Sequence, residues 1–181
     1  GLVFFFQAML ALIQYQSSAE ALQQIVFWSM GSLTRANWAA NGVLAAVLII
    51  ALPILWALGW RLTALRLGDA RATAMGINTS RLRVVVLIVV SLVAATTVAF
   101  AGIIGFIGLV GPHIARMLVG EDQRYFLPAS MAAGAAVMCA AHAVSLMIKP
   151  GLAIPIGIVT SLLGVPFFIA IVMTRRRALW T

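Results

Sequence analysis

Residues 84–115 read VVVLIVVSLVAATTVAFAGIIGFIGLVGPHIA, an apolar stretch of 32 residues without a charged side chain. A membrane-crossing helix needs roughly 20 apolar residues, with a range of about 17–25, so the stretch is too long for one crossing and short for two. Arg81 and Arg83 precede it and Arg116 follows it. Because arginine favours the cytoplasmic side, the stretch is predicted to cross outward and return. The reversal is placed at 101–105 (AGIIG), where glycine tolerates the backbone angles of a tight turn.

The whole chain has the composition of a membrane protein. Of its 181 residues, 64% are hydrophobic and 9% are charged, and the mean hydropathy is +1.11. Soluble domains are only about 45–50% apolar. The net charge of +8 invites a nucleic-acid partner, but the chain has one lysine and no basic runs interleaved with aromatic residues, so no nucleic acid is expected. The single cysteine, Cys139, rules out an internal disulfide.

The same reasoning predicts an all-α, polytopic membrane helix bundle with about six crossings, forming one domain over residues 1–181. In chain order, the predicted spans are 1–17, 38–60, 84–100, 106–119, 127–148 and 154–174. Ten arginines then lie inside, whereas Arg35 and Lys149 lie outside. This asymmetry predicts a multi-pass protein of the cell inner membrane with both chain ends in the cytoplasm. The short fourth span contains Pro112, so we expect it to be tilted or only partly helical.

Residues 18–38 are predicted to connect the first two spans at the outer surface. Apolar residues recur there at helical spacing with Glu20, Gln23 and Gln24 opposite them, a pattern typical of a short amphipathic helix. A connector anchored at the lipid headgroups is favoured over a lid above a substrate path.

Motifs for catalysis and for cofactor binding are missing from the sequence. It contains no G-x-x-x-x-G-K-[S/T], no H-E-x-x-H and no clustered Cys and His, so we expect no enzyme activity, cofactor or metal site. No acidic residue lies within a predicted span, which argues against an ion-coupled carrier. His142 is expected to form a helix–helix hydrogen bond, and His113 to cap or pack locally.

Small residues are abundant in the second half of the chain. Glycine recurs every third residue from Gly102 to Gly111, and residues 132–136 are all alanine or glycine. Because the hydrophobic effect does not drive helices together in lipid, such faces favour close backbone approach. They predict tight helix packing rather than ligand contacts.

Residues 61–83, RLTALRLGDARATAMGINTSRLR, interrupt the apolar pattern with five arginines. Asp69 and Gly76 are placed to cap the start and the end of a short helix, and Asn78 to begin another. The first helix presents small faces and one adaptable methionine, Met75. A solvated cytoplasmic loop is the simpler interpretation, but a capped, small-faced helix favours docking onto another protein.

Four stretches carry a resemblance to a known family. LGDARATAMGINTSRLR (67–83) resembles the cytoplasmic coupling segment of FecCD-type permeases, which are membrane subunits of ABC importers for ferric siderophores, haem and cobalamin. Residues 105–130 (GFIGLVGPHIARMLVGEDQRYFLPAS) resemble the most characteristic run of that family, and residues 154–172 and 27–33 match as well. Such a permease has ten spans, so the chain looks like its C-terminal six.

The resemblance implies partners and roles for particular residues. Two permease copies or halves would form the pathway, two cytoplasmic ABC ATPase subunits would grip the coupling segment (residues 61–83), and a periplasmic or lipid-anchored binding protein would deliver the substrate. The implied residues are Arg66, Leu67, Gly68, Asp69, Arg71, Ala72, Met75 and Gly76 at the ATPase interface, Gln7, Gln14, Thr160 and Ser161 along the pathway, and Arg35 and Lys149 for outer docking. A ferric siderophore or related iron chelate is the expected substrate, with haem or cobalamin as the alternative.

The sequence departs from the family pattern near the outer surface. Asp is common at the place of His142, Arg near Leu146 and Glu near Ala153, and all three are replaced here. The family's contacts with its binding protein therefore do not carry over. Two other functions stay open from the residues, namely a secondary carrier or channel without an ATPase and a scaffold subunit that only anchors other proteins.

Overall fold

The computed structural model describes residues 1–148 and 154–177, and the regular structure within these residues is entirely α-helical, as predicted. In chain order the helices are α1 (Leu2–Gln16), α2 (Ala19–Ser29), α3 (Trp38–Leu65), α4 (Asp69–Ala74), α5 (Thr79–Ala101), α6 (Ile107–Val119), α7 (Gln123–Ile148) and α8 (Ile156–Arg177). The side chains of residues 170–172 and 174–177 are not described.

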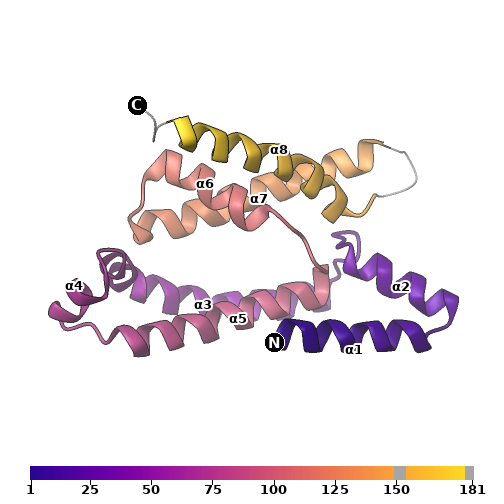
Figure 1. Ribbon diagram of the computed structural model, residues 1–181, viewed down its shortest axis with the longest axis horizontal. Helices are drawn as coiled ribbons and strands as arrows, with labels where there is room; N and C mark the ends of the chain where they lie inside the picture. Colours follow the sequence, from indigo (N-terminus) through magenta and orange to yellow (C-terminus); the bar gives the residue numbers. More distant parts are fainter. Residues whose placement is uncertain (149–153, 178–181) are drawn as a thin grey trace.

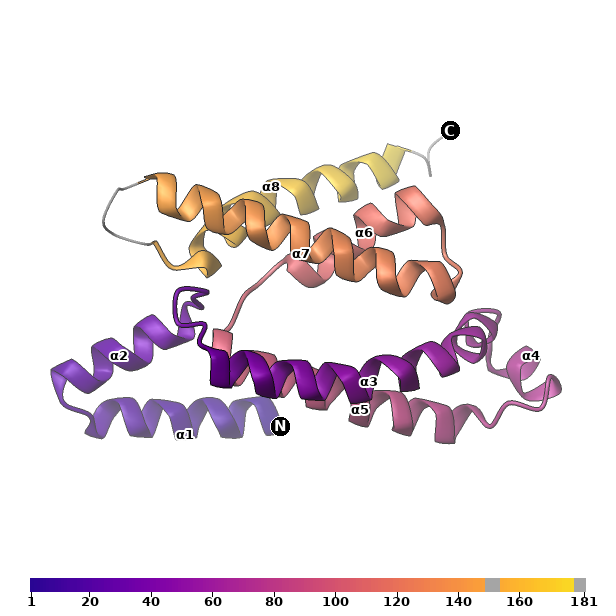
Figure 2. The ribbon, with the colours of Figure 1, turned by 180° about the vertical axis from the view of Figure 1, so that it is seen from behind.

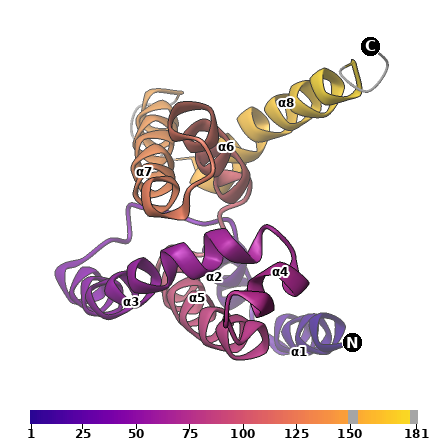
Figure 3. The ribbon, with the colours of Figure 1, turned by 90° about the vertical axis from the view of Figure 1, so that its left-hand side faces the viewer.

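The helices form two layers (Figure 1). In one layer α3 and α5 lie side by side, together with α1 and α2, and the other layer contains α6, α7 and α8. Figure 2 shows the same layers from behind, and Figure 3 shows them along the long axis of the molecule. The short helix α4 lies at one end of that axis and the turn between α1 and α2 at the other. Helices α3 and α5 run in opposite directions between the α4 end and the segment that follows α2.

The reversal of the chain predicted within residues 84–115 is confirmed. Helix α5 ends at Ala101, Gly102 adopts a positive φ of 76°, and α6 runs back from Ile107 to Val119. Helix α6 is helical throughout, although it contains Pro112. This proline removes one intrahelical hydrogen bond, and the helix continues for seven residues beyond it.

Among the described residues, three helices, α3, α5 and α7, are each long and apolar enough to cross a membrane. The other predicted spans correspond to shorter apolar helices, namely α1, α6 and the segment Ile156–Ile169 of α8. Helix α3 also extends past the predicted end at Trp60 to Leu65. In this last part of the helix, the Thr63 hydroxyl donates back to the carbonyl of Gly59 at 3.1 Å.

The predicted amphipathic connector is confirmed as α2. The Ser18 hydroxyl accepts a hydrogen bond from the backbone N–H of Ala21 at 3.3 Å, which caps the start of this helix. Glu20 occupies its first turn, where a carboxylate complements the positive end of the helix dipole.

Backbone hydrogen bonds join the segment after α2 to the neighbouring helices at that end of the molecule. The N–H of Gly157 donates to the carbonyl of Met30 at 3.1 Å, and the N–H of Ile156 donates to the carbonyl of Gly31 at 3.2 Å. The N–H of Ser32 in turn donates to the carbonyl of Ala101 at 2.8 Å. We call this meeting point, residues 30–32 with 101–102 and 156–157, the outer junction.

Two glycines make the outer junction possible. A Cβ atom on Gly157 would collide with the carbonyl oxygen of Met30, and one on Gly102 would collide with the carbonyl oxygen of Trp28. A similar close approach brings α6 onto α7, where a Cβ on Gly111 would lie 3.1 Å from the Cα of Gly134. The prediction that small residues serve close packing is therefore confirmed at Gly102, Gly111 and Gly134.

Proline is distributed unevenly among the long helices. One lies inside each of α3, α6, α7 and α8, at Pro53, Pro112, Pro128 and Pro166. Helix α5 contains neither proline nor glycine. An interior proline removes a backbone hydrogen bond and favours a kink, so α5 has fewer points at which it can bend.

The outer junction gives a direct test of this packing. Gly157→Ala is expected to lower the free energy of unfolding by about 1–3 kcal/mol, the usual effect of overpacking, read as the midpoint of denaturation in detergent. Gly108→Ala is the matched control, because a Cβ there meets nothing within 4 Å and alanine favours a helix. Equal destabilisation by the two substitutions would contradict the assignment.

Candidate functional site

The coupling segment (residues 61–83) consists of the end of α3, the helix α4 and the start of α5. Gly68, with a φ of 100°, precedes α4, and Gly76, with a φ of 78°, follows it. Gly76 therefore terminates α4 with a left-handed backbone, as predicted. The side chain of Asn78 accepts a hydrogen bond from the N–H of Arg81 at 2.9 Å, which confirms its predicted role at the start of α5.

The role expected for Asp69 as an N-cap is wrong. Gly68 occupies the N-cap position of α4, without a side-chain cap, and Asp69 is the first helical residue. Its carboxylate instead accepts a hydrogen bond from the guanidinium of Arg83 at 2.7 Å, which joins α4 to α5. The sequence placed this acid at the correct end of the helix but could not show which cation lies opposite it.

The expectation that Ala72 forms part of an accessible docking face is also corrected. Ala72 is 0% exposed and packs in an apolar cluster with Ala64 of α3, Ile77 and Leu82 of α5. Its small side chain allows α4 to lie against α3 and α5. Ala72 therefore holds the coupling segment together rather than facing a partner.

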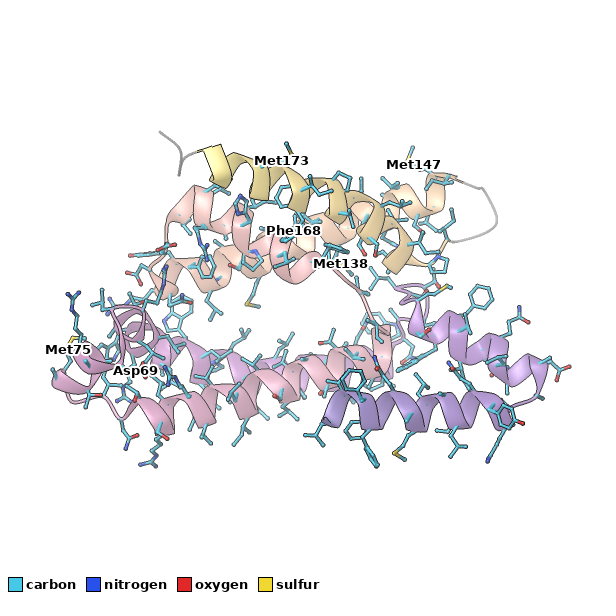
Figure 4. All side chains as sticks on the ribbon, viewed as in Figure 1. Asp69, Met75, Met138, Met147, Phe168 and Met173 are labelled. Atoms are coloured by element: carbon cyan, nitrogen blue, oxygen red, sulfur yellow. The ribbon has the colours of Figure 1, made fainter. Side chains whose placement is uncertain are left out.

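The outward face of the coupling segment carries two large apolar side chains among charged ones. Leu67 is 56% exposed and Met75 is 48% exposed, and both lie at the end of the molecule where α4 projects. Figure 4 shows Met75 and Asp69 on this projecting helix. Of the residues predicted for an ATPase interface, those exposed are Arg66, Leu67, Gly68, Asp69, Arg71, Met75 and Gly76.

A charge cluster links the coupling segment to the other helical layer. The carboxylate of Glu121, between α6 and α7, accepts from Arg66 and also pairs with Arg116 of α6 at 3.2 Å. Arg66 donates in addition to the carbonyl of Glu121 at 3.1 Å, and the N–H of Gln123 donates to the Thr63 hydroxyl at 3.1 Å. The sequence analysis did not predict this cluster. The chain has only four acidic residues, and the position of Glu121 between Arg116 and Arg124 could have indicated it.

The four residues predicted along a pathway do not form one group. Gln7 is exposed and Gln14 is half-buried on α1, which lies in the layer opposite α8 (Figure 3). Thr160 on α8 is buried, and its hydroxyl donates to the carbonyl of Gly157 at 3.2 Å. The hydroxyl is therefore hydrogen-bonded within its own helix. Ser161 lines a hollow of about 500 Å³ beside the outer junction, together with Ser29, Met30, Ile103, Gly105, Gly157, Ile158 and Leu162.

One of the two predicted outer docking residues lies within the described part of the chain. The guanidinium of Arg35 donates to the carbonyl of Phe27 at 2.8 Å, and Arg35 lines a hollow of about 530 Å³ with Glu20, Gln23 and Gln24 of α2. Lys149 lies outside the described residues. The structure therefore places a mixed polar surface at the α2 end, with one arginine in it.

The two histidines lie apart from each other. His113 packs edge-on against Phe167 with ring centroids 5.6 Å apart, which agrees with the predicted local packing. His142 is half-buried on α7. Within residues 1–148 and 154–177, no three His, Cys, Asp or Glu side chains gather in a way that could hold a metal ion.

Comparison with known proteins places this arrangement in a transporter family. Residues 1–174 match the FecCD transport family. The chain is 36% identical to the hemin transport system permease protein HmuU of Yersinia pestis over 170 residues, 93% of this chain and 51% of HmuU. It is 37% identical to the molybdate import system permease protein MolB of Haemophilus influenzae over 173 residues, 95% of this chain and 51% of MolB.

A solved structure shows the same fold. The chain matches a metal-chelate type ABC transporter in an inward-facing conformation with a TM-score of 0.88 and 37% identity, covering 93% of this chain and 56% of that one. The chain thus spans about half the length of the relatives it matches. The match over residues 1–174 and the shared helical architecture lead to one conclusion, namely that the chain belongs to the FecCD transport family.

Proposed function

We propose that this chain is part of the transmembrane subunit of an ABC importer of the plasma membrane. The family match over residues 1–174 carries the proposal, and the three long apolar helices of a multi-pass membrane protein support it. The subunit provides a path and has no catalytic role, so ATP is hydrolysed by separate ABC ATPase subunits. A second permease copy or half completes the path.

The coupling segment is the surface that the ATPase grips. Leu67 and Met75 are large apolar side chains exposed at a charged end of the molecule, and exposed apolar groups of this kind are characteristic of protein contacts. The burial of Ala72 against α3 and α5 supports this role, because a contact made on α4 then displaces both helices together. This assignment places the α4 end on the cytoplasmic side.

Glu121 passes that displacement to the second layer. Its carboxylate is shared by Arg66 of the coupling segment and Arg116 of α6, so a movement of α4 pulls on both layers. The outer junction and the segment between α2 and α3, which contains Arg35, lie at the end of the α3–α5 pair opposite α4. A periplasmic or lipid-anchored binding protein delivers its substrate there.

The substrate is a ferric siderophore or a related iron chelate. HmuU is named for hemin, and the solved relative is a metal-chelate type transporter. MolB is named for molybdate, at a similar identity, so an oxyanion is the competing substrate. The hollow at Ser161 is walled mainly by apolar side chains and backbone, which suits a bulky chelate more than a small, strongly hydrated anion.

The coupling surface can be tested with one charge. Leu67→Glu is expected to weaken association with the ATPase subunit about tenfold, because truncating or charging a central apolar contact typically costs more than 1 kcal/mol. Co-purification and ATP-dependent uptake in proteoliposomes measure it. Ala36→Glu adds the same charge at an exposed position near α2 and should leave association unchanged. Wild-type association of Leu67→Glu would refute the assignment.

A charge exchange tests the role of Glu121. Glu121→Arg is expected to lower the amount of solute moved per ATP several-fold, while the fold loses little stability because exposed ion pairs contribute about 0–1 kcal/mol each. The exchanged pair Arg66→Glu/Glu121→Arg restores the attraction and should recover part of the stoichiometry. Normal stoichiometry in Glu121→Arg, or no recovery in the exchanged pair, would argue against the linkage.

Uptake by the reconstituted complex, with its ATPase and binding protein, tests the substrate. Iron from a ferric siderophore is expected to accumulate only with ATP, and molybdate to stay at background. Accumulation of molybdate instead would contradict the substrate assignment but would still agree with the proposal that the chain belongs to an ABC importer. Uptake in vesicles without an ATPase subunit would overturn the importer in favour of a secondary carrier.

A further inference from the structure

A hollow of about 580 Å³ lies between α3, the loop after α4 and the start of α5. We call it the inner hollow. Its walls are Leu58, Trp60 and Arg61 of α3, residues 75–78 of the loop, and Arg81, Leu82 and Val85 of α5. It therefore combines two guanidinium groups and an indole ring with an apolar floor.

The two arginines of the inner hollow lack a counter-charge within the described part of the chain. Ion pairs there involve Arg66, Arg83 and Arg116, whereas Arg61 and Arg81 form none. The guanidinium of Arg61 lies over the Trp60 ring, 5.9 Å from its centroid. Arg81 stands in the first turn of α5, where a cation opposes the positive end of the helix dipole.

Arg83 is a second cation near the start of α5, and its charge is paired. It stands two residues further into α5 and is offset by the carboxylate of Asp69 at 2.7 Å. Arg81 has no such partner in the described residues, so an external anion would relieve both its charge and the dipole. A planar guanidinium pairs well with phosphate oxygens in a bidentate geometry.

Apolar residues continue the two arginine-bearing faces along each helix. On α5, Val85 and Ile88 follow Arg81 at helical spacing, and Ile88 is 64% exposed. On α3, Leu58 and Ile54 precede Arg61 at the same spacing, and Ile54 is exposed as well. Each face thus passes from a cation to apolar surface in the direction of the membrane interior, with Trp60 at the level that interfacial aromatic residues favour.

We propose that the inner hollow binds an anionic phospholipid. Its headgroup phosphate lies between Arg61 and Arg81, and its acyl chains follow the exposed faces of α3 and α5. Basic pockets between membrane helices on the cytoplasmic side are known to hold acidic headgroups. A soluble anion would use the arginines but not the apolar faces, and a protein partner would not require apolar surface that continues toward the hydrocarbon.

The proposal depends on the proposed function for the side of the membrane on which the hollow lies, and the hollow shares Met75 and Gly76 with the proposed ATPase surface. Lipid retention can be measured without ATP, substrate or transport. A failed transport experiment therefore leaves the lipid site untouched, and a failed lipid experiment leaves the importer untouched.

Native mass spectrometry of the full-length permease with its ATPase tests the site. The protein is released from nanodiscs of palmitoyl-oleoyl phosphatidylglycerol and phosphatidylcholine in equal amounts, and the retained lipids are counted. We expect several-fold enrichment of phosphatidylglycerol, reduced at least threefold in Arg61→Gln/Arg81→Gln and kept in Arg61→Lys/Arg81→Lys. Arg124→Gln, an exposed arginine in the first turn of α7, is the matched control and should keep the enrichment.

Several outcomes would overturn the site. They are equal retention of the two lipids, equal loss in Arg124→Gln, and displacement of the lipid by millimolar inorganic phosphate, which would show a soluble-anion site. Loss of the lipid whenever the ATPase binds would assign the hollow to that protein. Thermal unfolding of each variant in detergent shows whether it folds. If Arg61→Gln/Arg81→Gln does not fold, Arg61→Lys/Arg81→Lys supplies a comparison that preserves the charge.

Discussion

Close approach of backbone to backbone at the outer junction is the constraint on which the arrangement of the helices depends. In lipid, apolar side chains gain nothing by leaving the solvent, so helices associate through contacts that small residues allow and through polar bonds. Gly157 and Gly102 let the carbonyls of Met30 and Trp28 approach α8 and α5 directly. The hydrogen bonds from Gly157, Ile156 and Ser32 then fix α2, α5 and α8 at one point.

The opposite end of the α3–α5 pair is held by a different chemistry. There, side chains make the connections, through Glu121 with its two arginines, Asp69 with Arg83, and the Thr63 hydroxyl with the N–H of Gln123. Exposed ion pairs of this kind contribute little to stability and exchange easily. One end of the α3–α5 pair is therefore joined by backbone bonds made beside buried or half-buried glycines, and the other end by charges that a partner can rearrange.

Local signals carried most of what could be predicted from the sequence. The reversal within residues 84–115 followed from the length of the apolar stretch and from the arginines at its ends, and the caps at Asn78 and Gly76 followed from residue type. The errors concern contacts between distant segments. The burial of Ala72 depends on Ala64 and Leu82, the partner of Asp69 lies 14 residues away, and Glu121 reaches Arg66 across 55 residues. No periodicity or cap pattern records such contacts.

The uneven distribution of proline gives the bundle an uneven stiffness. Helix α5 starts in the coupling segment, ends at the outer junction and has neither proline nor glycine along its 23 residues, a length of about 35 Å at 1.5 Å per residue. Helices α3, α6, α7 and α8 each contain a proline at which they can flex. Because α5 is the stiffer element, a displacement of the chain at Asn78 is transmitted along this helix to Gly102 mainly as a translation, with little bending.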